Sequence, residues 1–544
     1  MKKKKLLLYG VLPLLGIIIV LFIFLGSYTD KVIDPYVRSL LEVTKPMGHT
    51  IEYRKIRVNL FQRSIIVKDV KVFPDSTSEG IGLWMEITVK DIRLTGFSLW
   101  QMIFDKTLKI KDLEILDPEV KITLPEQREA VVRQVRKEKA SKKGSQLLTH
   151  IFLEKIIFSD GSFQLIKDSV VLAKANDIKL LAQSIALAKN NQEEPIGFTY
   201  GDITLNLSNI DLYSQTGLYD MSLSEFAFTK SDSAVVLEGF RMIPKYDKQE
   251  FSSKLKFQND RFDVKIGQVK LNGIGIARFL AGEPLEISSI LIDKVNADIY
   301  RDKNVPFDMN RFPPFYNESF LKIPISLHID TVEVTNSAIH YGELVAGHRV
   351  AGTISLDPFS LQLYNLTNQI DDRAVDPVMH AHVQAKVMGE GPLKAELVLP
   401  LKGNLHNFTC SGSVGAMQLK PLNDMLEPSI NIKFNGGKVN RMTFSFDAND
   451  NVSKGWMEFL YQDLDVELLQ KESGNAKGFL SSLANWVAVS NNPSPGKKLK
   501  IVEIGYERDK NKGIINYVWK TIQSGMVRTI VPLKKYQINR KKDK

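Results

Sequence analysis

The sequence predicts a mainly β protein: an N-terminal transmembrane helix, then an elongated, curved, repetitive antiparallel β-groove with a few short helices and a C-terminal amphipathic helix. Three observations predict this fold class. An uncharged apolar run opens the chain, alternation of apolar and polar residues begins at Ile51, and one apolar pattern occurs five times. Because 44% of the residues are hydrophobic, the chain can bury a large surface, which argues against disorder.

The opening apolar run is long enough to cross a bilayer. Lys2–Lys5 precede 23 residues without a charge, Leu6 to Tyr28, which span roughly 35 Å as a helix. A cleaved signal peptide has a shorter apolar core and a small-residue cleavage site, and this segment shows neither. We therefore predict an uncleaved transmembrane span from Leu6 to Leu25, with a cytoplasmic N-terminus and the rest of the chain exported.

The net charge of +10 is concentrated at the two ends of the chain. Lys2–Lys5 carry +4 and residues 528–544 carry +6, so residues 6–527 are neutral. Basic ends on a neutral body are typical of proteins that contact membrane surfaces, and we expect no nucleic-acid partner. The single cysteine, Cys410, excludes an intramolecular disulfide and is interpreted as a small buried apolar residue.

The apolar spacing h-x-h-x-x-h-x-h, where h is apolar, recurs at intervals of 43 and 42 residues. One spare residue in an alternating run is typical of a β-bulge, which keeps the apolar set on one face while the strand bends. The pattern therefore predicts a curved sheet built by repetition. The copies are Ile65/Val67/Val70/Val72, Leu108/Ile110/Leu113/Ile115, Ile151/Leu153/Ile156/Phe158, Leu285/Ile287/Ile290/Ile292 and Leu327/Ile329/Val332/Val334.

A second apolar pair follows in the last four copies, four residues after the pattern ends. Asp117-Pro118, Asp160-Gly161 and Asn336-Ser337 lie in this gap, and all are turn formers. Each repeat is therefore predicted to be a strand, a turn and a second strand. Residues 125–147 are expected to be a charged, solvated insertion.

Five segments follow from these patterns. We expect a cytoplasmic tip and anchor at 1–28, a juxtamembrane helix and linker at 29–50, and a repetitive β-sheet body at 51–350. A second β part is expected at 351–470, and amphipathic helices with a basic tail at 471–544.

The last predicted helix has an apolar face that contains Ile515, Trp519, Ile522 and Met526, and basic residues follow it. This composition is typical of a helix that lies in a membrane interface. A helix that caps the end of a sheet is the alternative.

Motifs for catalysis or metal binding are incomplete. Gly273–Gly275 lacks the third glycine of a dinucleotide site, and Asp447–Glu458 matches a calcium loop only in part, with Val452 in the glycine position. His380 and His382 share one face of a strand, but no third ligand is spaced to join them. We therefore expect no enzyme activity, no cofactor and no metal.

Several segments share patterns with one known family. They are Ile51–Val70, Leu291–Asp302, Ile339–Glu343, Gly437–Phe446 with Gly455–Leu464, and Asn516–Lys520. The chain resembles the AsmA-like proteins of Gram-negative envelopes. This resemblance implies a repeating β-groove, kin to the bridge-like chorein-type lipid transfer proteins, which carries phospholipid between the inner and outer membranes. It also implies a single-pass inner-membrane protein with its bulk in the periplasm.

One face of an alternating sheet is apolar and must be covered. Because few helices are predicted, the cover is a second sheet, closure of the sheet, or a ligand such as the acyl chains of a phospholipid. The alternative function is a non-enzymatic scaffold for envelope assembly, with a filled core and a protein partner. The C-terminus is expected to reach the outer membrane or an outer-membrane protein. The predicted groove-lining residues are Val67, Val70, Ile110, Leu113, Leu153, Ile156, Ile287, Ile290, Ile329 and Val332.

Overall fold

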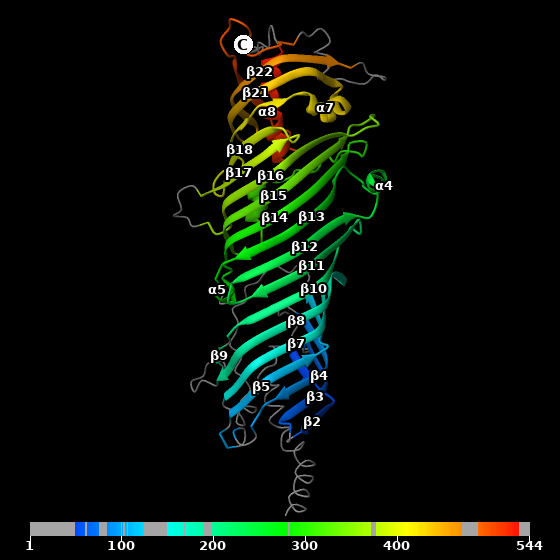
Figure 1. The fold of residues 1–544 in the computed structure, drawn as a ribbon, viewed down its shortest axis with the longest axis vertical. Helices are drawn as coiled ribbons and strands as arrows, with labels where there is room; N and C mark the ends of the chain where they lie inside the picture. Colours follow the sequence, from blue (N-terminus) through cyan, green and yellow to red (C-terminus); the bar gives the residue numbers. More distant parts are fainter. Residues whose placement is uncertain are drawn as a thin grey trace, which may run out of the picture. The chain divides into compact units, whose positions relative to one another are not determined.

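The computed structural model describes residues 49–59, 62–74, 84–98, 101, 104–105, 107–124, 150–167, 169–188, 197–199, 201–214, 216–280, 283–370, 377–469 and 488–531 (Figure 1). The predicted span Leu6–Leu25 and the insertion at 125–147 lie outside these residues, as does almost all of the predicted juxtamembrane segment. Among the described helices, none has the length and apolar character that a membrane crossing requires.

The described residues are mainly β-strand and belong to two compact units. The first unit comprises Met1–Gly217 with Met221–Asp232, and the second comprises Leu218–Asp220 with Ser233–Lys544. The predicted boundary at residue 350 falls within the second unit, where neighbouring strands pair across it, with Glu343 opposite Gly352.

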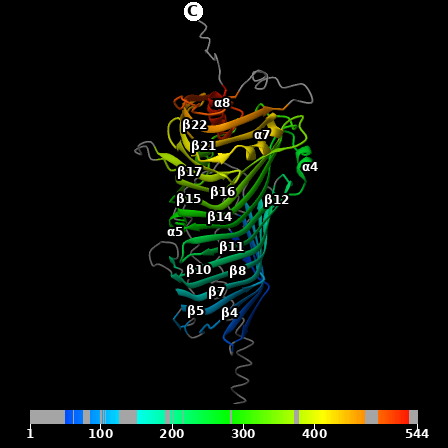
Figure 2. The same ribbon diagram turned by 45° about the horizontal axis from the view of Figure 1, so that its top comes forward.

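The first unit is a curved sheet (Figure 2). β3 pairs with β1 and β2 on one side and with β4 on the other, and β4 also pairs with β5 and β6. β7 pairs with β5, β6 and β8, and β8 continues to β9 and β10. The strands are β1 (His49–Glu52), β2 (Lys55–Asn59), β3 (Ser64–Pro74), β4 (Trp84–Thr95), β5 (Thr107–Leu116), β6 (Glu119–Leu124), β7 (His150–Lys167), β8 (Val170–Ala188), β9 (Gly197–Thr199), β10 (Ile203–Tyr213) and β11 (Tyr219–Thr229).

The second unit is a sheet whose strands pair largely in chain order, with helices at its ends and edges. Its strands are β12 (Ala234–Pro244), β13 (Asp260–Asn272), β14 (Leu285–Asp302), β15 (Leu327–Leu344), β16 (Gly352–Thr367), β17 (Val378–Val387), β18 (Gly391–Pro400), β19 (Phe408–Val414), β20 (Met417–Gln418), β21 (Ile432–Ala448), β22 (Val452–Leu468) and β23 (Ile501–Glu507). Its helices are α4 (Lys248–Ser253), α5 (Ile276–Leu280), α6 (Tyr316–Leu321), α7 (Asn423–Ile430) and α8 (Ile514–Ile530), with a 3₁₀ turn at Lys420–Leu422.

The sheet is mixed, so the prediction of a wholly antiparallel sheet is wrong. β5 and β6 run parallel to β7 with an offset of 43 residues, for example Leu108 opposite Ile151. β14 runs parallel to β15 with an offset of 42 residues, for example Leu285 opposite Leu327. Parallel neighbours need a long return connection. Residues 303–326, which include α6, provide that return between β14 and β15.

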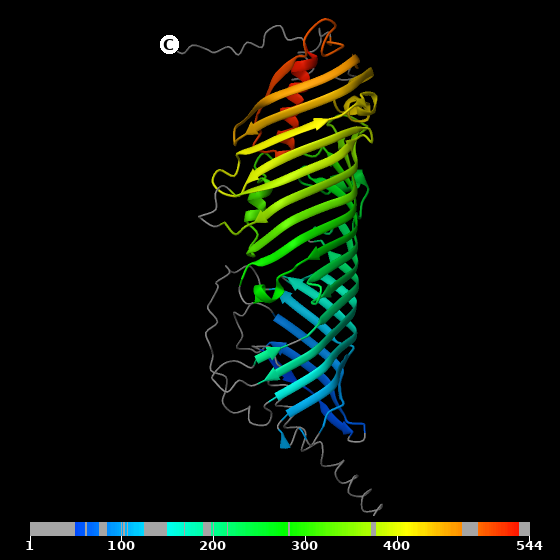
Figure 3. The ribbon, with the colours of Figure 1, turned by 60° about the vertical axis from the view of Figure 1, so that its left-hand side comes forward.

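The predicted bulges are not found at the phase slips of the repeat. At each slip the pairing skips one residue of each strand and then continues in the same register, so neither strand has an extra residue there. In β3, Asp69 is left out of the strand register and has a φ of 53°. In the other copies the residue at the slip has no partner in the strand register. The residue opposite it on the neighbouring strand has a positive φ. These pairs are Lys111 with Gly96, Glu154 with Ser184, Ser288 with Gly273, and Asp330 with Asn365. Register shifts of the bulge type lie elsewhere, around Gly161 in β7 and around Ser337 in β15. Bulges bend strands, in keeping with the curvature visible in Figure 3.

Two of the three predicted turns are wrong. Asp117-Pro118 does separate β5 from β6. By contrast, β7 and β15 run without a break through Asp160 and Asn336, which have φ values of 57° and 49°. Asp and Asn tolerate the left-handed conformation, so these residues form bulges within long strands where the sequence suggests turns.

Candidate binding face

One face of the second-unit sheet carries two unbroken rows of apolar or small residues. Within each row, every residue lies opposite the next in the strand register, from β12 to β23. Row A is Leu237, Val269, Ile292, Val334, Leu361, Val383, Ala395, Gly412, Phe444, Met457 and Val502. Row B is Val235, Leu271, Ile290, Val332, Leu363, Ala381, Leu397, Cys410, Phe446, Gly455 and Ile504. Ten inter-strand steps of about 4.8 Å give each row a length on the order of 50 Å.

The rows are covered at one end and partly open along the rest. Row A is half-buried on every strand from β12 to β18, whereas Phe444, Met457 and Val502 are buried. Row B changes in the same way, although Val332 and Ala381 are already buried. The sheet therefore presents a band of incompletely covered apolar side chains along β12–β18.

α8 covers the buried end of the rows, and in Figure 3 the red helix lies along the orange strands. Its buried face contains Tyr517, Thr521 and Gly525, and it packs on β22 and β23. Gly525 allows a close approach, because a Cβ there would meet Met457 Sδ at 2.7 Å. The hydroxyl of Thr521 lies 2.6 Å from Ser453 Oγ.

The predicted membrane-surface residues of α8 do not form one exposed stripe. Ile515 and Trp519 are 60% and 45% exposed, whereas Ile522 and Met526 pack against the core. Two of the four residues are thus exposed and two are packed, while contact of α8 with a membrane stays a prediction. The alternative, a helix that caps the sheet, fits the small-residue face of α8. Small side chains on this face let the helix approach the strands closely.

The first unit has equivalent rows. Ile110 lies opposite Leu153, and Val70 lies opposite Val89; all four side chains belong to the buried cluster of this unit. One row is Val67, Ile92, Ile115, Phe158, Leu180 and Leu205, and the other is Ile65, Leu94, Leu113, Ile156, Ala182 and Ile203. All six predicted lining residues of this unit thus lie on the apolar face, and Leu113 and Ile156 are partly buried.

The four predicted lining residues of the second unit also lie together. Ile290 and Val332 are neighbours in row B. Ile287 lies opposite Ile329, three residues earlier on the same two strands. Ile287 and Ile329 are each 6% exposed and share the core cluster with Phe315, which is fully buried. Ile287 and Ile329 therefore lie in a filled part of the face, while Ile290 is accessible.

A charged cluster lies on the same face at the ends of β13, β14 and β15. Arg301 donates to both carboxylate oxygens of Asp260, at 2.7 and 2.6 Å. Glu343 accepts hydrogen bonds from Lys303 Nζ at 2.5 Å and from the Tyr341 hydroxyl at 2.8 Å. Burial, reinforced by the Glu343 charge, raises the pKa of Tyr341 far above its ordinary value.

Two lysines of the second unit are held in poorly solvated positions near this cluster. Burial lowers the pKa of Lys520, and the nearby charge of Lys303 lowers it further. Burial also lowers the pKa of Lys512, whose Nζ lies 3.3 Å from the centroid of the Phe307 ring. The nearby carboxylate of Glu343 partly opposes the lowering of both pKa values.

The sequence-based prediction does not include the charged residues Arg301 and Glu343, nor Glu396. Arg301 and Glu343 lie opposite each other because β14 and β15 are parallel, and apolar spacing alone does not reveal strand direction. Glu396 lies opposite His382 across a hairpin with Gly389 at its turn. The signal was a Gly-containing turn midway between the two residues, which sets the register of a hairpin.

Comparison with known proteins adds no relative. No family model matches the chain, and no curated protein matches it. The AsmA-like resemblance thus depends on the sequence segments quoted above.

Proposed function

We propose that this chain is an AsmA-like protein, anchored in the inner membrane and extended into the periplasm, that binds phospholipid acyl chains along its apolar rows. In this role it contributes to phospholipid transport between the inner and outer membranes and to outer-membrane homeostasis.

The observation that carries this proposal is the half-buried part of rows A and B. Val269 and Ile292 are neighbours in the register, and each keeps part of its surface exposed. An acyl chain lying along the rows would remove that surface from water. Each buried CH₂ group contributes about 0.8 kcal/mol, so ten methylenes would contribute about 8 kcal/mol before the costs of ordering.

The position of the cations supports a lipid over a purely apolar ligand. Lys512 and Lys520 have lowered pKa values and lie beside the charged cluster on the row face. A phosphate headgroup at this point would stabilise their charged forms while its acyl chains lie along the rows. Lys520 Nζ at present donates to Gln523 Oε1 at 2.9 Å, so it is placed to exchange a neutral acceptor for an anionic one.

Lipid that copurifies with the full-length protein tests the proposal. We expect phospholipid in extracts of protein purified in mild detergent, and at least a severalfold loss in the Ile292→Glu variant. A glutamate in row A places a charge where the acyl chain would lie, which is unfavourable. Lys265→Glu is the matched control, because Lys265 is exposed on neighbouring β13.

Circular dichroism establishes that both variants are folded. Wild-type protein without phospholipid would contradict the proposal and favour the scaffold with a filled core. An equal loss of lipid in the Lys265→Glu control would show that the rows are not the binding surface.

A further inference from the structure

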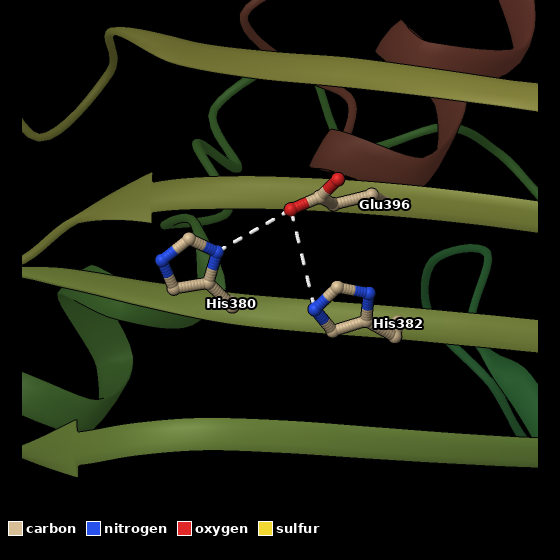
Figure 4. Close-up of side chains that lie close together, drawn as sticks. All are labelled: His380, His382 and Glu396. Carbon is tan, nitrogen blue, oxygen red and sulfur yellow. Dashed lines mark hydrogen bonds and ion pairs between the residues drawn. The ribbon is translucent and has the colours of Figure 1, made fainter.

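A second site lies on the other face of the second-unit sheet. Met379 and Ala381 of β17 are buried, so His380 and His382 between and beside them face away from the core. Glu396 of β18 lies opposite His382 in the register and on the same face (Figure 4). The strand pleat thus brings two imidazoles and one carboxylate together.

These three side chains converge on one point. Glu396 Oε1 lies 3.4 Å from His380 Nδ1 and 4.0 Å from His382 Nε2. One donor atom of each residue lies within 4.8 Å of the other two. The imidazole rings are nearly parallel, with an interplanar angle of 10°, and the Tyr364 ring packs edge-on against His382.

This geometry is close to that of a metal site. Ligand atoms at about 2.0–2.2 Å from a tetrahedral zinc ion are roughly 3.4 Å apart. The His380–Glu396 separation already has this value, and the His382–Glu396 separation, 4.0 Å, is only 0.6 Å longer (4.0 − 3.4). The side chains are 38%, 42% and 42% exposed, so an ion can reach them from solvent.

We propose that His380, His382 and Glu396 bind a divalent transition-metal ion, with Zn²⁺ as the reference ion. Two imidazoles and one carboxylate form a common three-ligand zinc set, which leaves a fourth position for water or for a donor from another molecule. Imidazole ligands favour Zn²⁺, Cu²⁺ and Ni²⁺ over Mg²⁺ and Ca²⁺. The site is independent of the apolar rows, so it does not depend on the proposed lipid function.

Zinc titration of the tag-free, full-length protein in detergent tests this proposal. We expect one Zn²⁺ per chain by calorimetry, no competition from excess Mg²⁺, and weaker binding at pH 5.5 than at pH 7.5, because metal-binding imidazoles must be deprotonated. His380→Gln, His382→Gln and Glu396→Gln should each weaken binding by about tenfold or more. X-ray absorption should show N/O ligands at about 2.0–2.1 Å.

His328→Gln is the matched control. His328 lies on β15 and contacts Asp330 at 2.9 Å. The substitution therefore removes a similar histidine–carboxylate contact, but one that has no second histidine beside it. Its zinc affinity should equal that of the wild type. Absence of zinc binding in the wild type would overturn the proposal, as would full binding by the His380→Gln/His382→Gln double variant with an unchanged circular dichroism spectrum.

Discussion

His406 lies between two carboxylates that come from distant parts of the chain. Its Nε2 is 3.1 Å from Glu318 and its Nδ1 is 2.9 Å from Asp450. Asp450 also pairs at 2.5 Å with Arg508, whose side chain is 5% exposed and lies 4.2 Å from the centroid of the Phe315 ring. The network ties the segment before β15 to the β21–β22 turn and to the segment after β23.

Asp450 should make the protein sensitive to acid. A hydrogen bond from Lys510, together with the charges of His406 and Arg508, lowers the pKa of the Asp450 carboxyl, although partial burial opposes this. Because the folded-state pKa lies below the unfolded value of about 3.9, the stabilisation is present above that value. It is lost as the pH falls through the folded-state pKa.

We therefore predict that Asp450→Asn lowers the free energy of unfolding at pH 7 by about 1–3 kcal/mol, since buried Arg508 loses a charged acceptor. The difference from wild type should shrink at pH 3, because the Asp450 carboxyl of the unfolded chain is then largely protonated and part of the stabilisation from its lowered folded-state pKa is lost. Urea denaturation at both pH values measures this. Exposed Asp447→Asn should stay within about 0.5 kcal/mol of wild type. A gap of equal size at both pH values would refute the assignment.

At the scale of elements, α8 shows that helix periodicity alone finds only part of the packed face. Ile522 and Met526 of the apolar stripe do pack against the core, but the fully buried residues Tyr517, Thr521 and Gly525 lie outside that stripe. Thr521 is compatible with burial because its hydroxyl donates to the Tyr517 carbonyl at 2.9 Å. The small face permits a closer approach to the sheet.

Gly525→Val tests this packing. The added side chain would collide with Met457 and Ile504, and overpacking of this kind costs about 1–3 kcal/mol. Urea denaturation should show this loss. Gly513→Ala is the matched control, because a Cβ at Gly513 meets nothing within 4 Å. Equal stability of the valine variant and the wild type would mean that α8 does not pack closely on the sheet.

The repeat itself was predictable from the sequence, while the direction of its strands was not. Asp69 and the other phase slips mark irregular positions in the strands, but the register continues unchanged across them, so the prediction of a one-residue bulge there is wrong. Leu285 and Leu327 share a pattern at an offset of 42 residues, but parallel and antiparallel strands have the same period of two. Direction is set by the return of residues 303–326, which apolar spacing does not encode.

At the scale of the whole molecule, the candidate site was predictable only as a face. Val67 and Ile290 could be placed on an apolar surface from alternation alone, and both lie in apolar rows. Their exposure could not be predicted, because it depends on elements remote in sequence. Ile287 is buried within a core cluster that includes residues as distant as Tyr517, whereas Ile290, three residues further on, remains half-buried.

Photo-crosslinking within intact cells tests the central claim most directly. A photoreactive amino acid at Ile292 in row A, or at the partly buried Leu113 in the first unit, should give phospholipid adducts detectable by mass spectrometry. Asp298, exposed on the same strand as Ile292, and Lys109, exposed on the same strand as Leu113, are the matched controls and should give none. Adducts confined to Ile292 and Leu113 are the predicted result; no lipid adduct at either, with the protein folded and abundant, would contradict a lipid-binding face.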